Sequence, residues 1–360
     1  MLKGINLKLM EARQRGQLKQ AIAFVLPPLY YPLGELKKTM PTYTGISSEA
    51  FRHPLDREAE QTLRRVPGFD LVARKFVEFL VERPQYVYMM GNSIQVGPRQ
   101  YSTLYGIFRE CIRDLDIYPE PTLFVSQAPV VNAYALGQDL PYIVLNTGLI
   151  DLMNEDEIRS VVAHELGHIK CGHTTLIQMA SWAIMAVFSL ADLTMGFSRI
   201  LSTGLILAFY EWLRKAELSA DRAAMLVMDD TRPVMQTMMK MAGGSTRYAH
   251  ECSLEEFTRQ AQRYQELDED SLNQVYKFFL YNNVSQGVFL THPFTVERVS
   301  YLQAWASSSE YREIKRGNYP RGGAQGSVEV KPESPAEQEA DRLRRQIEEL
   351  QQEINRIKGE

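Results

Sequence analysis

The residues of this chain best suited to chemistry form the pentapeptide His164-Glu165-Leu166-Gly167-His168. If this segment is helical, the two histidines lie about 40° apart on one face, because successive residues of a helix are separated by about 100°. Glu165 is then turned about 100° from His164, so that its carboxylate lies beside a bound ion rather than on it. This spacing predicts a catalytic zinc site, with the Glu165 carboxylate beside the metal.

The segment around the two histidines has the sequence of an amphipathic helix. Asn154 and the three acidic residues that follow it supply a helix cap and negative charge for a first turn. Apolar side chains follow at helical spacing, at Ile158, Val161, Val162, Leu166 and Ile169. We therefore expect a helix over residues 149–169 that carries both histidines.

A hydrolytic zinc site needs a third protein ligand and leaves its fourth position to water. His173 would point about 140° away from His168 on a continuing helix, so we interpret His173 as structural or capping. Glu217 is the better candidate, because Glu217 and Asp221 are one helical turn apart. One carboxylate can then bind the ion while the other contacts the outer nitrogen of a ligand histidine. The competing interpretation is a surface helix with paired charges.

The alanines near Glu217 bear on how closely its helix can approach the histidines. Small side chains keep this helix slim enough to lie close to the histidine helix. They are Ala216, Ala220, Ala223 and Ala224.

Composition limits the class of protein. Of 360 residues, 45% are apolar, which is enough to bury the core of one or two domains. A formal net charge of -4 gives no general basic character, so we do not expect a nucleic-acid partner. The three cysteines are too few and too scattered for a disulfide framework. With no signal-peptide pattern at the start, we expect a protein in the cytoplasm or on the cytoplasmic face of a membrane, and not a secreted one.

The distribution of strand-like and helical patterns predicts an α+β, mainly helical domain with a small β-sheet. Short β-like runs are expected at residues 86–90, 93–96, 122–125, 131–136 and 142–146. Helices are expected at residues 55–65, 69–81 and 100–115, and the chain after residue 149 is almost entirely helical in pattern.

Four parts are expected along the chain. Residues 1–45 form a basic, partly apolar arm, residues 46–312 the metal-binding domain, and residues 313–335 a linker. Residues 336–360 have apolar side chains at alternating spacings of four and three, which predicts a short coiled-coil helix. Only about three heptads are present, so both a homodimer through residues 340–357 and a solvated, marginal helix stay open.

Two further segments raise the question of membrane contact. Residues 176–191 and 200–210 are strongly apolar, at or below the shortest length that spans a bilayer. They can associate with a membrane, with the basic arm as a second anchor, or form a helical hairpin packed on the domain. The sequence leaves both alternatives open.

Four motifs, spread over about residues 46–310, resemble the gluzincin peptidases that include HtpX and the CAAX prenyl proteases, and they occur in the family order. The motifs are Asn146-Thr147-Gly148-Leu149, the histidine pentapeptide, Glu217-Leu218-Ser219-Ala220-Asp221, and Thr291-His292-Pro293 with Arg298.

The resemblance implies a role for each residue that matches a motif. His164, His168 and Glu217 would bind one zinc ion per chain, Glu165 would be the general base and acid, and Asp221 would contact a ligand histidine. His292 would stabilise the oxyanion, with Arg298 supporting it. From the residues alone, His292 ahead of a proline fits a helix entry equally well.

The segment Asn132-Ala133-Tyr134 is similar to an edge strand of the same family, with tyrosine in place of the commoner phenylalanine. The resemblance implies that this strand flanks the active-site helix and faces the substrate. An edge strand can pair with an extended peptide through backbone hydrogen bonds while demanding little of the peptide's side chains.

These patterns together favour a zinc metalloendopeptidase that cleaves unfolded or extended protein segments with a water activated by Glu165. A role in protein quality control fits a site with no selective pocket. The alternative is a non-catalytic, zinc-stabilised scaffold that recruits partners through its C-terminal coiled coil. A CAAX-type prenyl protease is a further hypothesis, although the chain has too few apolar segments for a multi-span chamber.

Overall fold

The computed structural model describes residues 42–66, 68–70, 73, 82–190, 197–283, 288–289 and 292–322. All of these belong to one folded unit, which begins at Met40. The basic arm up to residue 41, most of the linker and the heptad segment lie outside the described residues, as does most of the helix expected at residues 69–81. The dimer through residues 340–357 therefore stays a prediction.

The larger sheet has four strands in the order β1-β2-β4-β3. Its central strands, β2 (Thr122–Ser126) and β4 (Tyr142–Asn146), are parallel, with Leu123 opposite Ile143. The outer strands β1 (Ile94–Gln95) and β3 (Ala133–Leu136) each run antiparallel to their neighbour. Among the described residues β3 pairs with β4 alone, so β3 is an edge strand of this sheet.

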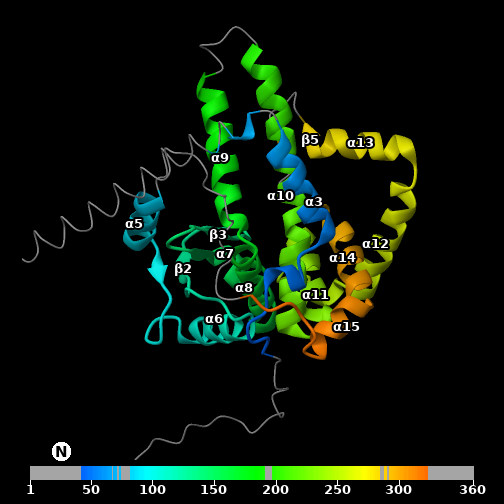
Figure 1. Cartoon of the computed structure of the whole chain (residues 1–360). Coiled ribbons are helices and arrows are strands. Elements are labelled where there is room, and N and C mark those ends of the chain that lie inside the picture. The colour runs from blue at the N-terminus through cyan, green and yellow to red at the C-terminus, as the bar shows by residue number, and fades with distance from the viewer. Residues whose placement is uncertain are drawn as a thin grey trace, which may run out of the picture. The chain divides into compact units, whose positions relative to one another are not determined.

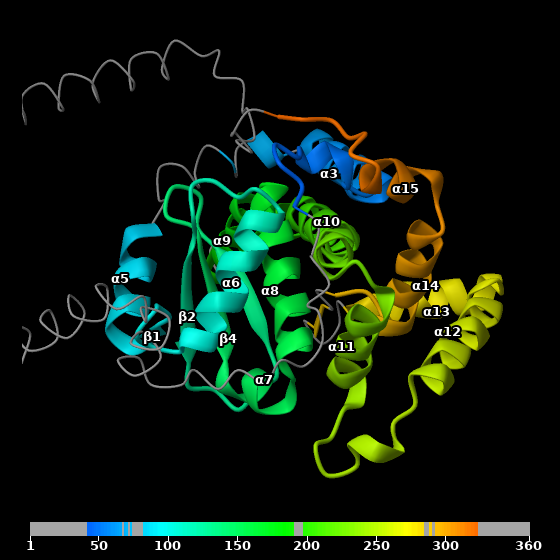
Figure 2. The ribbon, with the colours of Figure 1, turned by 90° about the horizontal axis from the view of Figure 1, so that it is seen from below.

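Helices cover both faces of this sheet, because successive side chains of a strand point to opposite faces. Leu123 and Val125 of β2 are buried with residues of α6 (Ser102–Asp114) and α8 (Glu155–Lys170). Phe124 is buried on the other face with Met89 of α5 (Glu82–Asn92). Figure 2 shows the sheet between α5 on one side and α6 with α8 on the other.

The remaining elements are mainly helical, which confirms the predicted α+β class. They are η1 (Ser48–Ala50), α3 (Pro54–Arg65), α7 (Thr147–Leu152), α9 (His173–Leu190), α10 (Phe197–Met228), α11 (Thr231–Gly243), η2 (Ala249–Glu251), α12 (Leu254–Asp268), α13 (Ser271–Tyr281), α14 (Thr295–Ala306) and α15 (Ser309–Lys315), with a hairpin of β5 (Asn282–Asn283) and β6 (Val288–Phe289). Figure 1 shows this arrangement.

The strand predicted at residues 86–90 was wrong, because this segment belongs to α5. Met89 is buried, and Tyr86 packs beside it against the aromatic rings of Phe124 and Tyr142. Residues three apart share one face of a helix, which lets both side chains reach the sheet. The sequence around Tyr86 and Met89 does not indicate which face is buried, because the neighbouring apolar residues Val87 and Tyr88 are both exposed.

The single helix predicted at residues 149–169 was also wrong, since the segment forms two helices. α7 ends at Leu152, and α8 begins at Glu155 after an extended Asn154. The Asn154 side chain accepts a hydrogen bond from the Glu157 amide, and the Glu157 side chain accepts one from the Asn154 amide. This capping box lies at the predicted cap and fixes the start of the histidine helix.

The histidine helix α8 lies very close to α10, which carries Glu217. A Cβ atom added to Gly167 would lie 2.7 Å from Ala223 Cβ and 3.0 Å from Ala220 Cα. No side chain larger than hydrogen fits there without movement, because the contacts are far below van der Waals separation. Glycine on one helix and alanine on the other therefore allow the approach that the sequence predicted.

Residues 176–190 of the first apolar segment lie in α9 and residues 200–210 lie in α10, and the two helices project together beyond the rest of the unit (Figure 1). Near their base, Leu176, Phe209 and Trp212 are buried in a cluster with Leu63 of α3. Among the described residues, no helix combines the length and the apolar character required to cross a bilayer.

Candidate metal centre

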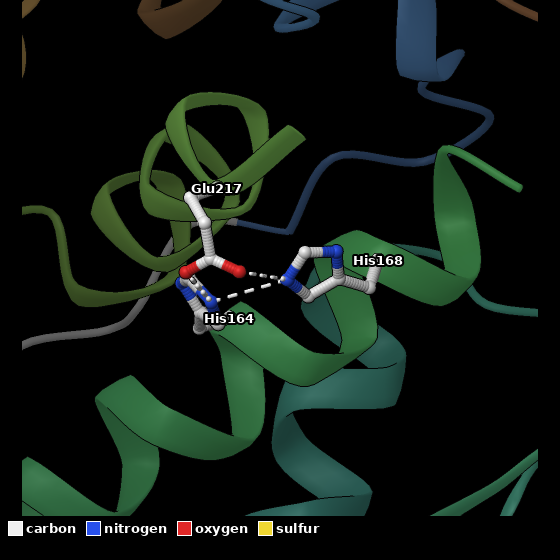
Figure 3. Close-up of side chains that lie close together, drawn as sticks. All are labelled: His164, His168 and Glu217. Carbon is white, nitrogen blue, oxygen red and sulfur yellow. Dashed lines mark hydrogen bonds and ion pairs between the residues drawn. The ribbon is translucent and has the colours of Figure 1, made fainter. Parts of the chain in front are cut away.

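Three side chains from two helices point at a common position in the core. His164 and His168 extend from α8, and Glu217 extends from α10 (Figure 3). Glu217 Oε2 lies 3.3 Å from His164 Nε2, and Glu217 Oε1 lies 3.3 Å from His168 Nε2. One nitrogen from each ring and a carboxylate oxygen all lie within 4.8 Å of one another. The structure thus brings together the three residues expected as ligands.

The outer nitrogen of His164 is held by Asp221. His164 Nδ1 lies 3.0 Å from Asp221 Oδ1, and a carboxylate can only accept a hydrogen bond, so Nδ1 carries the proton. Arg298 donates to both oxygens of Asp221, at 2.8 and 2.6 Å. Burial lowers the pKa of His164, but the carboxylates of Asp221 and Glu217 have a larger, opposite effect and raise this pKa to about 10.

His168 is held by a second histidine, His173, which the sequence indicated to be structural or capping. His168 Nδ1 lies 3.0 Å from His173 Nδ1, and His173 Nε2 lies 3.0 Å from Asp56 Oδ2. Asp56 accepts a hydrogen bond from His173 Nε2, so in the tautomer with its only proton on Nε2, His173 accepts at Nδ1 and His168 donates to it. The chain of hydrogen bonds from Asp56 to His168 therefore fixes the ring orientation of His168, as Asp221 does for His164.

The expected direction of the His173 side chain, away from His168, was wrong because the helix does not continue. α8 ends at Lys170, and Gly172 has a φ of +70°, which favours glycine and ends helices. His173 then begins α9 and turns back toward His168. The signal was present in the sequence, since glycine just after a helical pattern is a helix stop.

Asp56 belongs to a buried polar cluster that spans three helices. Its carboxylate accepts hydrogen bonds from Ser219 Oγ at 2.7 Å, Trp212 Nε1 at 3.2 Å and Arg52 Nε at 2.9 Å. Burial opposes ionisation, but the contacts to His173 and Arg52 hold the pKa of Asp56 well below its usual range. Asp56 is thus an ionised acceptor for His173, and no sequence signal connected residue 56 with the histidines.

The residues at this centre fit a divalent metal ion. In the neutral form that binds a metal ion, each ring carries its proton on Nδ1 and presents a lone pair at Nε2, and the two Nε2 atoms lie 3.2 Å apart. The Glu217 carboxylate adds negative charge at the same point, since His292 and Arg298 outweigh its burial and hold its pKa well below the usual range. The raised pKa of His164 means that this position favours positive charge, which a proton or a divalent ion can supply, and the donor set is typical of zinc.

Glu165 lies beside this centre in a cleft of about 210 Å³. The cleft is also lined by His168, Glu217, His292 and the β3 residues. Burial raises the pKa of Glu165 to about 7, which is the range suited to a group that accepts and returns a proton near neutral pH.

His292 and Arg298 both contact the Glu217 carboxylate. His292 Nδ1 lies 2.9 Å from Glu217 Oε2, and about half of the His292 side chain is exposed. Arg298 Nη1 lies 3.2 Å from the same oxygen, and the other donors of Arg298 contact Asp221. The structure therefore places Arg298 behind Asp221 and Glu217, and it shows no bond from Arg298 to His292 among the described contacts.

The segment Asn132, Ala133 and Tyr134 borders the same cleft. Asn132 precedes β3, and its carbonyl accepts a hydrogen bond from the Asn146 amide at 3.1 Å. The Asn146-Thr147-Gly148 motif thereby positions the segment. A Cβ atom on Gly148 would lie 2.3 Å from the Pro129 carbonyl oxygen, so only glycine permits this approach.

Comparisons with known proteins agree with this geometry. The family model described as Peptidase family M48 matches residues 98–306. The plastoglobule-localized metallopeptidase 48 of Arabidopsis thaliana is 33% identical over 84% of this chain and 83% of its own length. A protease HtpX homolog of Helicobacter pylori is 25% identical over 60% of this chain and 71% of its own length. A protease HtpX homolog of Sulfolobus acidocaldarius is 26% identical over 60% of this chain and 80% of its own length.

No solved structure matches the chain. The resemblance inferred from the four motifs is confirmed by the family model and by the named relatives. The chain therefore belongs to peptidase family M48 and is an HtpX-like metallopeptidase.

Proposed function

We propose that this protein is a zinc-dependent endopeptidase. The observation that supports this most strongly is the convergence of His164 Nε2, His168 Nε2 and the Glu217 carboxylate, each histidine held by its own partner. Zinc bound there would polarise the peptide carbonyl and lower the pKa of a water molecule in its open position.

Glu165 is the proposed general base and acid. Its carboxylate borders the cleft, and a pKa of about 7 lets it accept a proton from the attacking water and return it to the leaving amine. His292 is placed to donate a hydrogen bond to the developing oxyanion. The carboxylate of Glu217 raises the pKa of His292, which favours the protonated form that can donate.

The edge strand β3 is the proposed site for the substrate backbone. Residues 132–134 border the cleft that holds Glu165, and β3 leaves one edge unpaired among the described strands. Added backbone hydrogen bonds would hold an extended peptide without selecting its side chains. We therefore propose unfolded or extended protein segments as substrates, which suits a role in protein quality control.

Two variants test the function. Glu165→Gln should bind zinc like the parent protein but lose casein hydrolysis, because the amide cannot accept the proton. His164→Ala should lose both zinc and activity. Zinc content and hydrolysis are measured for each protein with and without phenanthroline, which should abolish the parent activity. Casein hydrolysis by Glu165→Gln at the parent rate would exclude Glu165 as the base.

Other expectations stay predictions from the sequence. They concern the cytoplasmic location, contact with a membrane and the dimer through the terminal heptads. The zinc content and casein hydrolysis of the parent protein also test the alternative of a non-catalytic scaffold, since a scaffold would bind zinc and hydrolyse nothing.

A further inference from the structure

The helix α13 presents apolar side chains to solvent and polar side chains to the protein. Its exposed residues are large, with 61% of Phe279, 61% of Leu280 and 58% of Leu272 accessible. The complete exposed apolar set is Leu272, Val275, Tyr276, Phe278, Phe279 and Leu280. This polarity is the reverse of a normal surface helix, whose apolar face packs on the core.

Hydrogen bonds and ion pairs hold α13 in this orientation. Lys277 lies 2.9 Å from Asp268 and 3.2 Å from Glu297, on the protein side of the helix. The Asn273 side chain donates to the Leu267 carbonyl at 2.8 Å. A rotation that buried the apolar side chains would break these bonds and expose Lys277, so the outward apolar face is a stable feature.

The exposed apolar surface extends around more than half of the helix. At about 100° per residue, the six apolar positions cover an arc of about 200°, and no charged residue falls within it. A neighbouring helix or a flat protein surface covers a stripe of about 100°. A fluid apolar medium covers a wider arc, because its molecules adapt to the side chains.

We propose that α13 lies in the surface of a lipid layer, with its apolar face among the acyl chains. Tyr276 suits this boundary, because its ring is apolar and its hydroxyl is polar. Glu269 and Asp270 lie at the start of α13 and would be repelled by anionic headgroups, so the expected lipid is zwitterionic. In the view of Figure 1, α13 lies at the same height as α9 and the projecting part of α10.

This contact would place the proposed active site next to the lipid. Tyr281, at the end of α13, stacks on Phe294 with ring centroids 4.6 Å apart, and its hydroxyl accepts the Phe294 amide at 2.8 Å. Phe294 precedes α14 and lies two residues after His292. The inference concerns location and does not depend on the peptidase proposal.

An environment-sensitive label on α13 tests the proposal in the full chain. A nitrobenzoxadiazole group is attached at Phe279→Cys in a Cys252→Ser background, because Cys252 is exposed and the other cysteines are buried. With phosphatidylcholine vesicles, we expect a blue shift, a several-fold rise in emission, and quenching by brominated acyl chains. The matched control carries the label at Glu266→Cys, an exposed position of α12, where we expect no change.

Each outcome decides the proposal. A response at position 279 alone that persists in 1 M NaCl supports it, because apolar burial is not screened by salt. If the protein sediments with vesicles while position 279 stays in water, another segment binds lipid and the proposal is wrong. If position 279 instead responds to protein concentration without vesicles, α13 binds a second copy, and the proposal is also wrong.

A pair of substitutions measures the contribution of the surface. Phe279→Ser with Leu280→Ser should weaken partition into phosphatidylcholine vesicles by about a hundredfold or more, since two large apolar side chains no longer enter the acyl region. Gln265→Ser with Glu266→Ser, at two exposed positions of α12, should leave partition unchanged. Equal partition of both double variants would contradict the proposal.

Discussion

The two histidines of the proposed site are oriented in different ways. Asp221 contacts His164 directly, whereas Asp56 reaches His168 through His173. A histidine between the carboxylate and the ligand lengthens the connection by one ring, so an acidic residue from a third helix can take part. The orientation of His168 therefore depends on a group that no metal-binding motif contains.

The role of His173 leads to a first prediction. His173→Ala should lower zinc affinity by about 10- to 100-fold, because His168 loses the acceptor that fixes its ring. Competition with a chromophoric chelator measures the affinity, and the absorption spectrum of the cobalt form reports the ligand geometry. His250→Ala is the control, since His250 is exposed and contacts only Glu251 among the described ion pairs. Equal affinities of the two variants would rule out the proposed role.

His53 gives a second prediction, on stability and pH. Burial lowers the pKa of His53 to about 4, with help from Arg222, and its neutral Nδ1 accepts a hydrogen bond from the Leu55 amide that caps α3. The unfolded chain, with a pKa near 6.5, binds the proton more readily than the folded chain. Stability is therefore full above pH 6.5 and decreases as the pH falls to 4, by up to about 3 kcal/mol.

His53→Asn keeps a capping acceptor and removes this titration. Urea unfolding of the two metal-free proteins at pH 7 and pH 4.5 measures the effect without interference from metal release. The variant should lose less stability between these pH values than the parent protein. A parallel loss in both proteins would show that His53 does not contribute.

At the scale of elements, the contact between α8 and α10 sets the distance between the histidines and Glu217. Gly167→Ala should destabilise the protein by about 1–3 kcal/mol, because the added methyl group would overlap Ala223 and force the helices apart. It should also weaken zinc binding, since the ligands come from both helices. Thermal unfolding and zinc competition measure these effects.

Gly204→Ala is the matched control for this contact. Gly204 lies in α10, and a Cβ atom there meets no atom within 4 Å. This variant should be more stable by about 0.5–1 kcal/mol, because alanine loses less backbone entropy than glycine in a helix. Equal stability of the Gly167 and Gly204 variants would contradict the close approach of α8 and α10.

Elements were predictable where the signal is local. Asn154 and Glu157 form a capping box within four residues, and β4 is a continuous apolar run that matches the predicted 142–146. α5 was not predictable, because its exposed Val87 and Tyr88 are as apolar as its buried Met89, so the sequence does not mark which face is buried. Glu217 and Asp221 were found through their spacing, whereas Asp56 acts across more than a hundred residues and leaves no spacing to recognise.

At the scale of the whole molecule, the open edge of β3 gives a prediction on substrates. If β3 holds the peptide backbone, N-methylation of one backbone amide near the scissile bond should lower kcat/KM by about fivefold or more, as expected for the loss of one hydrogen bond. Methylation several residues away is the control. Kinetics on a matched peptide set measure the effect, and a uniform rate across the set would remove β3 from the substrate site.

The position of Asp56 also bears on which part of the chain is needed for a working enzyme. The family match begins at residue 98, whereas Asp56 belongs to α3, well ahead of it. A truncated protein that starts at residue 98 would keep His164, His168 and Glu217 but would leave His173 without its anionic neighbour. Such a fragment should require more zinc for the same activity, so the minimal catalytic unit is longer than the sequence signature of the family.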